Sequence, residues 1–533
     1  MKMKYLKLIG LATLVVWASI SYTALAQKDV RLIPADTGGS DNGIVATSIG
    51  TKYIILGTPG RAQDFATIFE GEGDKWRQTA QLTGDGGAFG HAVAITDVPG
   101  RSNSALAIVG APRHDGVGSD SGEAYVFALS GRDWNPQARL RASDGAAGDE
   151  FGYAVSVNGH TALIGAPKVD DRGANAGAVY VFVRDGARWV QRAKLFAKDA
   201  ARSDGFGESV ALLGNTAIIG TPQSEHAGVK FAGAAYVFER EGDRWVEKAK
   251  LTADDPGKAD RFGFAVAIGA DTVVVGAPLK DTAGGQDAGA AYIFGRDGNS
   301  WKQLAKILGK DGRKGDKFGN GVATNGNVAI VGAPIRREDA FASGAAYAFA
   351  RVDGVWQEKE KVVPKNGAKD LHFGASVGIN NNTVAIASHH ETKCADCGWP
   401  HGDGSSAYVY SSIESFGTPP FAVEPIELKV TTLGRVKRTA LFQNFPNPFN
   451  PETWLPYQLA SDAPVNLRIY NVRGQLVREL DLGLRKSGSY KAQESAAHWD
   501  GRDQFGEEVS SGMYFYTMRS GAFQATRRML ILK

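Results

Sequence analysis

A Phe-Gly dipeptide recurs along most of this 533-residue chain at a nearly constant spacing. Its Phe residues are separated by steps of 62, 55, 56, 56 and 55 residues. They are Phe89, Phe151, Phe206, Phe262, Phe318 and Phe373. Such a constant period is typical of repeat architectures, in which each unit packs on its neighbours. The chain is therefore expected to fold as a series of similar units.

Each repeat contains the same succession of short apolar segments. In the repeat that begins at Phe151, an apolar run ends at Pro167, a second run covers 177–182, and Trp189 precedes a Lys-Leu pair. Alternation of apolar and polar residues, Val and aromatic residues, and intervening Gly turns predict four antiparallel strands per repeat. Four short antiparallel strands are the content of one propeller blade. The many tight turns also explain the 67 glycines.

The repeats predict an all-β fold with a seven-bladed β-propeller over residues 27–412. A degenerate first repeat starts at Asn42-Gly43, and the seventh, from Phe373, lacks the outer strand that carries Trp and Lys-Leu. The segment from Arg31 to Asp36 resembles that missing strand. We expect it to complete the seventh blade and close the ring, because an open ring would expose a strand edge.

The two ends of the chain differ from the repeats. Three Lys precede an apolar run and a small-residue cleavage site, which predicts a signal peptide over residues 1–26. Its removal takes the formal net charge from +3 to 0, so nothing global favours nucleic acid or anionic lipid. Residues 413–440 are predicted to be a linker. Residues 441–533 contain alternating apolar runs between Gly turns and predict a small Ig-like β-sandwich.

These patterns resemble two known families. Phe-Gly followed about 14 residues later by Gly-Ala-Pro is similar to the FG-GAP repeats of integrin alpha-like propellers. The Asn444–Pro451 segment together with Trp499-Asp500-Gly501 resembles a FlgD-like Ig domain, related to type IX secretion sorting domains. The second resemblance implies a sorting machinery as a partner, with attachment at the outer-membrane surface or release outside the cell. Many propeller relatives bind calcium in an Asp-rich loop, but the corresponding loops here are short and poor in Asp, so no cofactor is expected.

The repeated acids and aromatic residues are expected to be structural. One Asp stands two residues ahead of Phe in four repeats, at Asp149, Asp204, Asp260 and Asp316. Equivalent positions favour capping of a turn over catalysis, which needs carboxylates in unlike environments. Tyr and Trp at the same period are expected to pack between blades. The chain contains no phosphate-binding Gly-rich loop followed by Lys-Ser or Lys-Thr, and no His-Glu-x-x-His motif.

One irregular cluster stands in the seventh repeat, where Gly-Ala-Pro is expected. It contains His389, His390, Cys394, Cys397 and His401. Cys-x-x-Cys with His could bind zinc through four ligands, so Cys394, Cys397 and His401 are weak metal candidates. In an exported protein a local Cys394–Cys397 disulfide or free thiols are favoured, and redox activity is a further alternative.

The loops after Gly-Ala-Pro vary between repeats and are predicted to form a ligand-binding face, because loops on a rigid scaffold can vary without cost to the core. The resemblance to integrin-like propellers places ligands on the face that bears these loops. The candidate residues are Arg113, His114, Asp115, Lys168, Asp171, Arg172, His226, Lys280, Asp281, Arg336, Arg337, His389 and His390.

The sequence therefore predicts a non-enzymatic binding or adhesion protein at the cell surface or outside the cell, with an extracellular protein or glycan as its ligand. No segment after the signal peptide is expected to span a membrane. A surface polysaccharide lyase or hydrolase that uses the propeller axis is the first alternative. It would require two unlike acids, or a Tyr or His with a metal, at the ring centre. A structural envelope protein without a soluble ligand is the second alternative.

Overall fold

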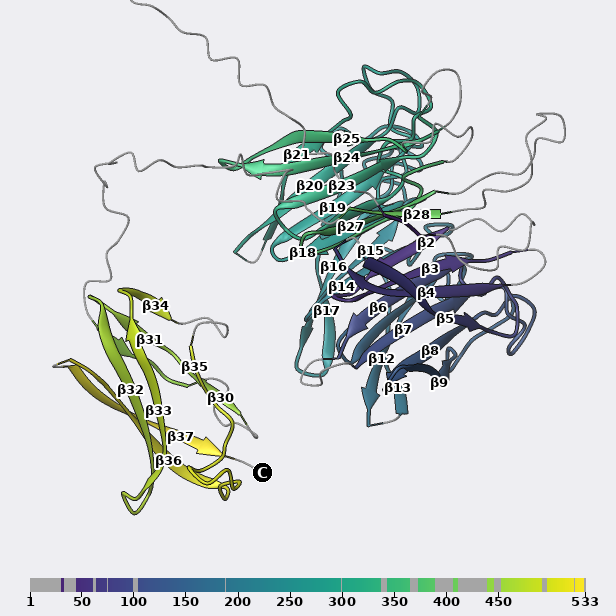
Figure 1. Ribbon diagram of the computed structural model, residues 1–533. Helices are drawn as coiled ribbons and strands as arrows, with labels where there is room; N and C mark the ends of the chain where they lie inside the picture. The colour runs from purple at the N-terminus through teal and green to yellow at the C-terminus, as the bar shows by residue number, and fades with distance from the viewer. Residues whose placement is uncertain are drawn as a thin grey trace, which may run out of the picture. The chain divides into compact units, whose positions relative to one another are not determined.

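The structure is a computed structural model, and it divides the chain into two compact units, Met1–Phe421 and Ala422–Lys533. It describes residues 30–32, 45–60, 64–73, 75–98, 104–186, 188–298, 300–336, 343–364, 372–388, 406–410, 439–444, 452–490, 496–521 and 523–531. Within these ranges every regular element is a β-strand, which confirms the all-β class (Figure 1). No helix there is long and apolar enough to cross a membrane. The predicted signal peptide and nearly all of the predicted linker lie outside the described residues.

The described part of the first unit contains seven four-stranded antiparallel sheets, as expected of propeller blades. In chain order their strands are β2 (Ala46–Ile49), β3 (Tyr53–Thr58), β4 (Phe65–Glu72) and β5 (Lys75–Thr83); β6 (Ala92–Asp97), β7 (Ala105–Ala111), β8 (Glu123–Ser130) and β9 (Asp133–Leu140); β10 (Ala154–Asn158), β11 (Thr161–Ala166), β12 (Ala178–Asp185) and β13 (Arg188–Leu195); β14 (Ser209–Leu213), β15 (Thr216–Thr221), β16 (Ala234–Glu241) and β17 (Arg244–Leu251); β18 (Ala265–Gly269), β19 (Thr272–Ala277), β20 (Ala290–Asp297) and β21 (Ser300–Ile307); β22 (Val322–Thr324), β23 (Val328–Ala333), β24 (Ala345–Val352) and β25 (Val355–Val362); and β26 (Val377–Asn380), β27 (Thr383–Ser388) and β28 (Ser406–Tyr410) with β1 (Val30–Leu32).

The pairing of β1 confirms the predicted closure of the last sheet. Val30 pairs with Val409 and Leu32 with Ala407, so the N-terminal strand supplies the outer position beside β28. The first strand of each sheet packs against the first strand of the next, and β26 packs against β2. These contacts make a closed ring with the first strands innermost.

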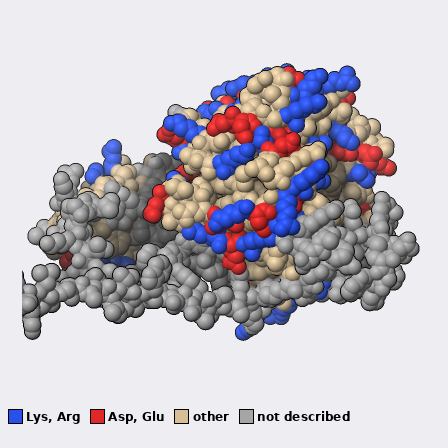
Figure 2. All heavy atoms as spheres, turned by 90° about the horizontal axis from the view of Figure 1, so that it is seen from above, with Lys and Arg blue, Asp and Glu red and all other residues tan. Residues whose placement is uncertain are grey.

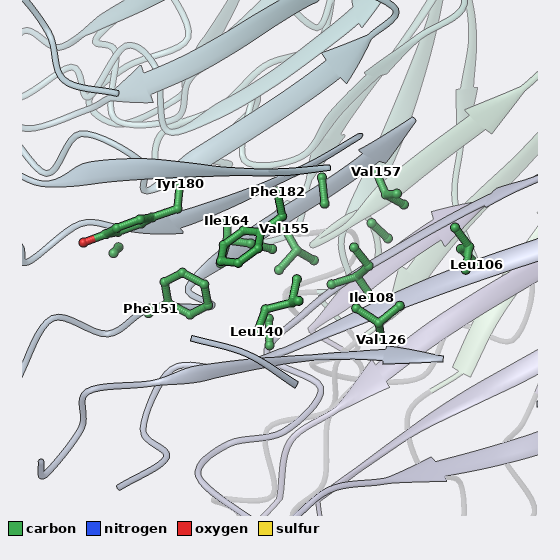
Figure 3. Close-up of a cluster of buried hydrophobic side chains, with 14 of the residues drawn as sticks. Leu106, Ile108, Val126, Leu140, Phe151, Val155, Val157, Ile164, Tyr180 and Phe182 are labelled. Carbon is green, nitrogen blue, oxygen red and sulfur yellow. The ribbon is translucent and has the colours of Figure 1, made fainter. Parts of the chain in front are cut away.

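Packing between neighbouring sheets explains the strand sequences. The middle strands are covered on both faces, and all six residues of β19 are buried. The outer strands alternate instead, as in β25, where Trp356 is buried between exposed neighbours. Figure 3 shows one cluster in which Leu106 and Ile108 of one sheet pack with Val155 and other residues of the next.

The Phe-Gly and Gly-Ala-Pro motifs join strands within and between sheets. The Gly152 amide donates to the Gly165 carbonyl at 3.0 Å within one sheet, and the Phe151 amide donates to Ser121 of the preceding sheet at 3.1 Å. The Phe151 ring lies edge-on to Tyr180, with ring centroids 5.4 Å apart (Figure 3). A Cβ at Gly165 would lie 2.1 Å from the Gly207 carbonyl oxygen of the next sheet, so only glycine allows this close packing.

The second unit contains a four-stranded sheet in the order β33-β32-β36-β37, a three-stranded sheet β29-β31-β34 and the pair β30-β35. Its strands are β29 (Ala440–Leu441), β30 (Thr453–Leu455), β31 (Tyr457–Leu459), β32 (Ala463–Asn471), β33 (Leu476–Arg485), β34 (Gly488–Tyr490), β35 (Ala497–Trp499), β36 (Gly512–Ser520) and β37 (Phe523–Ile531). Trp499 is fully buried in its core, and its indole N–H donates to the Arg502 carbonyl at 2.8 Å. This is the small β domain that the sequence predicts.

Candidate functional site

The residue immediately after each Phe-Gly stands at one end of an innermost strand. These six equivalent positions hold unlike, half-buried side chains, and we call the set the axial mouth: His91, Tyr153, Glu208, Phe264, Asn320 and Ala375. The scaffold around them repeats, whereas the six side chains do not. Positions that differ between otherwise equivalent repeats can form one specific site on the ring.

A cavity of about 370 Å³ lies at one side of the axial mouth, which we call the mouth cavity. It is lined by Arg113, Glu150, Tyr153, Pro167, Lys168, Asn175, Ser203, Gly205, Glu208 and Gln223. These residues come from three successive sheets and the loops between them. The volume falls within the range of ligand pockets, roughly 300 to 1,000 Å³.

Some polar groups of the mouth cavity are paired and others are not. The Lys168 ammonium contacts the Glu150 carboxylate at 2.7 Å, and the Gln223 amide donates to Glu208. The His91 and Tyr153 rings lie against each other with centroids 4.8 Å apart. Within the described residues, the Arg113 guanidinium and the Tyr153 hydroxyl make no hydrogen bond or ion pair. Unpaired donors therefore border a carboxylate that has one amide partner.

Burial shifts the protonation equilibria of the axial mouth. It raises the pKa of Glu208, against the hydrogen bond from Gln223 and the charge of Arg261. Burial lowers the pKa of His91, and the nearby Glu150 carboxylate opposes this effect. The pKa of Tyr153 is raised by burial and then by Glu208 and Glu150. His91 is thus favoured as a neutral ring, and the mouth cavity is lined by two acids in different surroundings, Glu150 paired with Lys168 and Glu208 bonded to Gln223.

Only two of the predicted ligand-face residues line the mouth cavity, Arg113 and Lys168. Two other exposed candidates make contacts within the ring. Asp115 accepts from the Asp120 amide of its own loop at 2.9 Å, and Asp171 contacts Lys194 of β13 at 2.7 Å. Four further candidates lie on loops outside the cavity. Arg172 and Asp281 are exposed, whereas His226 and His114 are half-buried. The remaining candidates Arg337, His389 and His390 lie outside the described residues, as do Cys394, Cys397 and His401.

Lys280 and Arg336 require a correction, because both are buried. The Lys280 ammonium contacts the Asp260 carboxylate at 2.8 Å, and the Arg336 guanidinium contacts Asp316 at 2.7 Å. Each stands two positions after Gly-Ala-Pro, where the chain turns inward, whereas Arg113 and Lys168 stand one position after it and face outward. The sequence alone does not show which of two adjacent loop cations points beneath the neighbouring loop.

The repeated acids have the predicted capping role. Asp149 accepts from the Ala146 amide at 2.8 Å, and Asp204 accepts from the Ala201 amide at the same distance. Asp260 and Asp316 repeat this bond to the residue three positions earlier. The periodic tyrosines are buried beside the Phe-Gly rings, so they offer no exposed stacking surface.

A larger cavity of about 500 Å³ lies at the rim, between β5 and β9. The loop that enters the second sheet is short, since Leu82 and Phe89 are seven residues apart. In the equivalent loop of the next sheet, Leu140 and Phe151 are eleven residues apart. Ser143 of the longer loop donates to Gln191 at 3.0 Å, and Pro136 stands at the place equivalent to Gln191. The short loop therefore leaves the outer strands uncovered.

Figure 2 shows Lys and Arg interleaved with Asp and Glu on the face that it presents, without a broad area of one charge.

Sequence reasoning missed His91, Tyr153 and Glu208. The signal that could have found them is the change of residue directly after each otherwise constant Phe-Gly. Among the described residues, no group of three or more His, Cys, Asp or Glu is arranged to hold a metal ion. The expectation that calcium is not required stays a prediction.

Comparison with protein families assigns both parts of the chain. The FG-GAP repeat model matches residues 76–127, 134–182, 189–238, 245–294 and 301–349. The FlgD Ig-like domain model matches residues 452–522. The chain contains five FG-GAP repeats and a FlgD Ig-like domain. Each FG-GAP match keeps the period of the four-stranded sheets, and a search of curated proteins finds no match.

Proposed function

We propose that this chain is an exported binding protein whose FG-GAP ring presents the axial mouth to an extracellular protein or glycan. The observation that carries the proposal is the mouth cavity, where Arg113, Tyr153 and Glu208 converge from different sheets. Unlike the periodic contacts elsewhere, this group does not repeat around the ring. The N-terminal segment with its predicted cleavage site supports export.

The binding test uses the mature chain, residues 27–533, on an array of glycans and extracellular matrix proteins. A double variant, Arg113→Ala with Glu208→Gln, removes two groups of the mouth cavity without touching the buried ion pairs. Saturable binding that the variant loses supports the proposal. Binding that the variant retains would place the ligand elsewhere, and an absence of binding would favour a structural envelope role.

A second candidate function is chemistry on a polysaccharide. It is favoured by the two acids that line the mouth cavity, since burial raises the pKa of Glu208 while Glu150 is paired with Lys168. Carboxylates in unlike surroundings, beside a neutral imidazole, suit general acid and base roles. Incubation with acidic and neutral polysaccharides, followed by assays for new reducing ends and unsaturated products, tests it. Products that persist in Glu208→Gln would count against this assignment.

For the FlgD Ig-like domain we propose sorting or attachment at the outer surface, as in type IX secretion. Its similarity in sequence to FlgD-like Ig domains supports this role. The test is to follow the location of the ring in producing cells with and without residues 441–533. Unchanged surface delivery of the truncated chain would contradict it.

A further inference from the structure

The mouth cavity offers hydrogen-bond donors and acceptors together. The Arg113 guanidinium and the Tyr153 hydroxyl can donate, and neither has a partner within the described residues. Glu208 accepts one bond from Gln223 and retains a second carboxylate oxygen for a further donor. A ligand that fits this set must both accept and donate at closely spaced atoms. Neighbouring hydroxyl groups on one ring have this property.

Aromatic rings border the same polar groups. His91 and Tyr153 lie in ring contact on one side of Glu208, and Phe264 occupies the next equivalent position on the other side. All three residues are half-buried, and Tyr153 lines the mouth cavity. Aromatic faces beside polar groups can pack on the C–H face of a ring whose edges carry hydroxyls.

The polar set is confined to one part of the ring. The residue that follows Gly-Ala-Pro or Gly-Thr-Pro is Arg113, Lys168 and Gln223 in three successive sheets. In the next two sheets it is Leu279 and Ile335, which cannot form hydrogen bonds through their side chains. Among these five described sheets, the polar residues at this position therefore fall in three neighbours only.

The size of the mouth cavity favours a small ligand over a protein surface as its occupant. About 370 Å³ accommodates one or two six-membered rings. A stable protein interface buries about 800 Å² on each partner and is anchored by apolar side chains, which the mouth cavity does not supply. Its lining is formed mainly by charged, amide and hydroxyl side chains.

We propose that the mouth cavity binds a saccharide unit of a glycan, with Glu208 accepting from its hydroxyls and Tyr153 and Arg113 donating to its oxygens. This inference rests on the proposed binding function and names the ligand class for the same site. Arg113 makes a carboxylated sugar acceptable as well as a neutral one, because its charge has no described partner.

The test uses the mature full-length chain on an array of neutral and uronic-acid oligosaccharides, followed by titration calorimetry with the strongest binder. We expect Glu208→Gln and Tyr153→Phe each to raise Kd at least about tenfold, the loss of one or two hydrogen bonds. Arg132→Ala is the matched control for Arg113→Ala, because Arg132 is exposed in the turn at the opposite end of β8. The control should leave Kd unchanged, and all variants should keep the melting temperature.

The outcomes separate the two proposals. A loss confined to uronic-acid ligands in Arg113→Ala supports the saccharide site and assigns that guanidinium to the sugar carboxylate. Saccharide binding that Glu208→Gln and Tyr153→Phe leave intact overturns this site. Binding of proteins alone overturns the saccharide class while the binding function stands, and silence toward both classes refutes the binding function as well.

Discussion

Replacing Arg336 by Ala should destabilise the ring rather than weaken ligand binding. The Arg336 side chain is 1% exposed, and its guanidinium contacts the 3% exposed Asp316 carboxylate at 2.7 Å. It also contacts Asp311 at 2.7 Å, which is 44% exposed. Truncation therefore leaves one buried carboxylate without its cation, which typically costs about 3 to 5 kcal/mol.

The lower end of that range applies, because Asp316 keeps its bond from the Arg313 amide at 2.8 Å and Asp311 keeps Lys361 at 2.9 Å. With an unfolding entropy of about 2.1 cal/mol/K per residue over roughly 380 residues, a loss of about 3 kcal/mol lowers the melting temperature by about 4 °C. Differential scanning calorimetry of the full chain measures this shift. The transition of the FlgD Ig-like domain serves as an internal reference.

Arg336→Lys is the matched variant, since Lys280 holds the equivalent Asp260 in the preceding sheet. It should recover most of the lost stability. Arg113→Ala removes an exposed guanidinium and should change the melting temperature by less than about 1 °C. An Arg336→Ala ring that melts within 1 °C of the wild type would refute the argument, because the buried carboxylate would then not need its cation.

Four further perturbations test the ring. The Cβ of Gly165→Ala would meet the Gly207 carbonyl oxygen at 2.1 Å, so this variant should lose about 1 to 3 kcal/mol of unfolding free energy in chemical denaturation. Gly50→Ala is the control and should be nearly neutral, because the nearest atom to its Cβ lies at 3.5 Å. Deleting residues 29–34, which include the 2% exposed Leu32, should markedly lower the melting temperature, and an unchanged value would reject closure by β1. Burial alone would raise the pKa of Asp255, but hydrogen bonds from Lys306 and Tyr292 hold that pKa below its usual value. The ionised Asp255 carboxylate therefore stabilises the fold above about pH 4, and this stabilisation is lost as the pH falls through the lowered pKa. Acid unfolding of Asp255→Asn should accordingly depend less on pH, and equal slopes would contradict this. EDTA should leave the melting temperature unaltered, and a drop of many degrees would reveal a structural calcium ion.

The repeated contacts of the ring were accessible from the sequence because they arise locally. Phe151, Gly152 and Gly165 recur at a fixed spacing, and each repeat must form the same four strands to bury its apolar residues against the next. The capping bond of Asp149 spans only three residues, so its register with Phe-Gly was enough to predict it. The N-terminal segment that completes the last sheet was recognisable because one repeat lacked its outer strand.

The candidate site depends on contacts between repeats, which no single repeat encodes. Arg113, Tyr153 and Glu208 are far apart in the chain and approach one another only because successive innermost strands pack side by side around the ring. The different burial of Arg336 and Arg113 also depends on contacts between segments. The loop that enters the sheet covers the second position after Gly-Ala-Pro, where Arg336 stands, and leaves the first position, where Arg113 stands, in solvent. The sequence by itself determined the repeating unit and its internal hydrogen bonds. Only the tertiary structure decided which side chains meet at the axis, because that depends on how each sheet is placed against its neighbours.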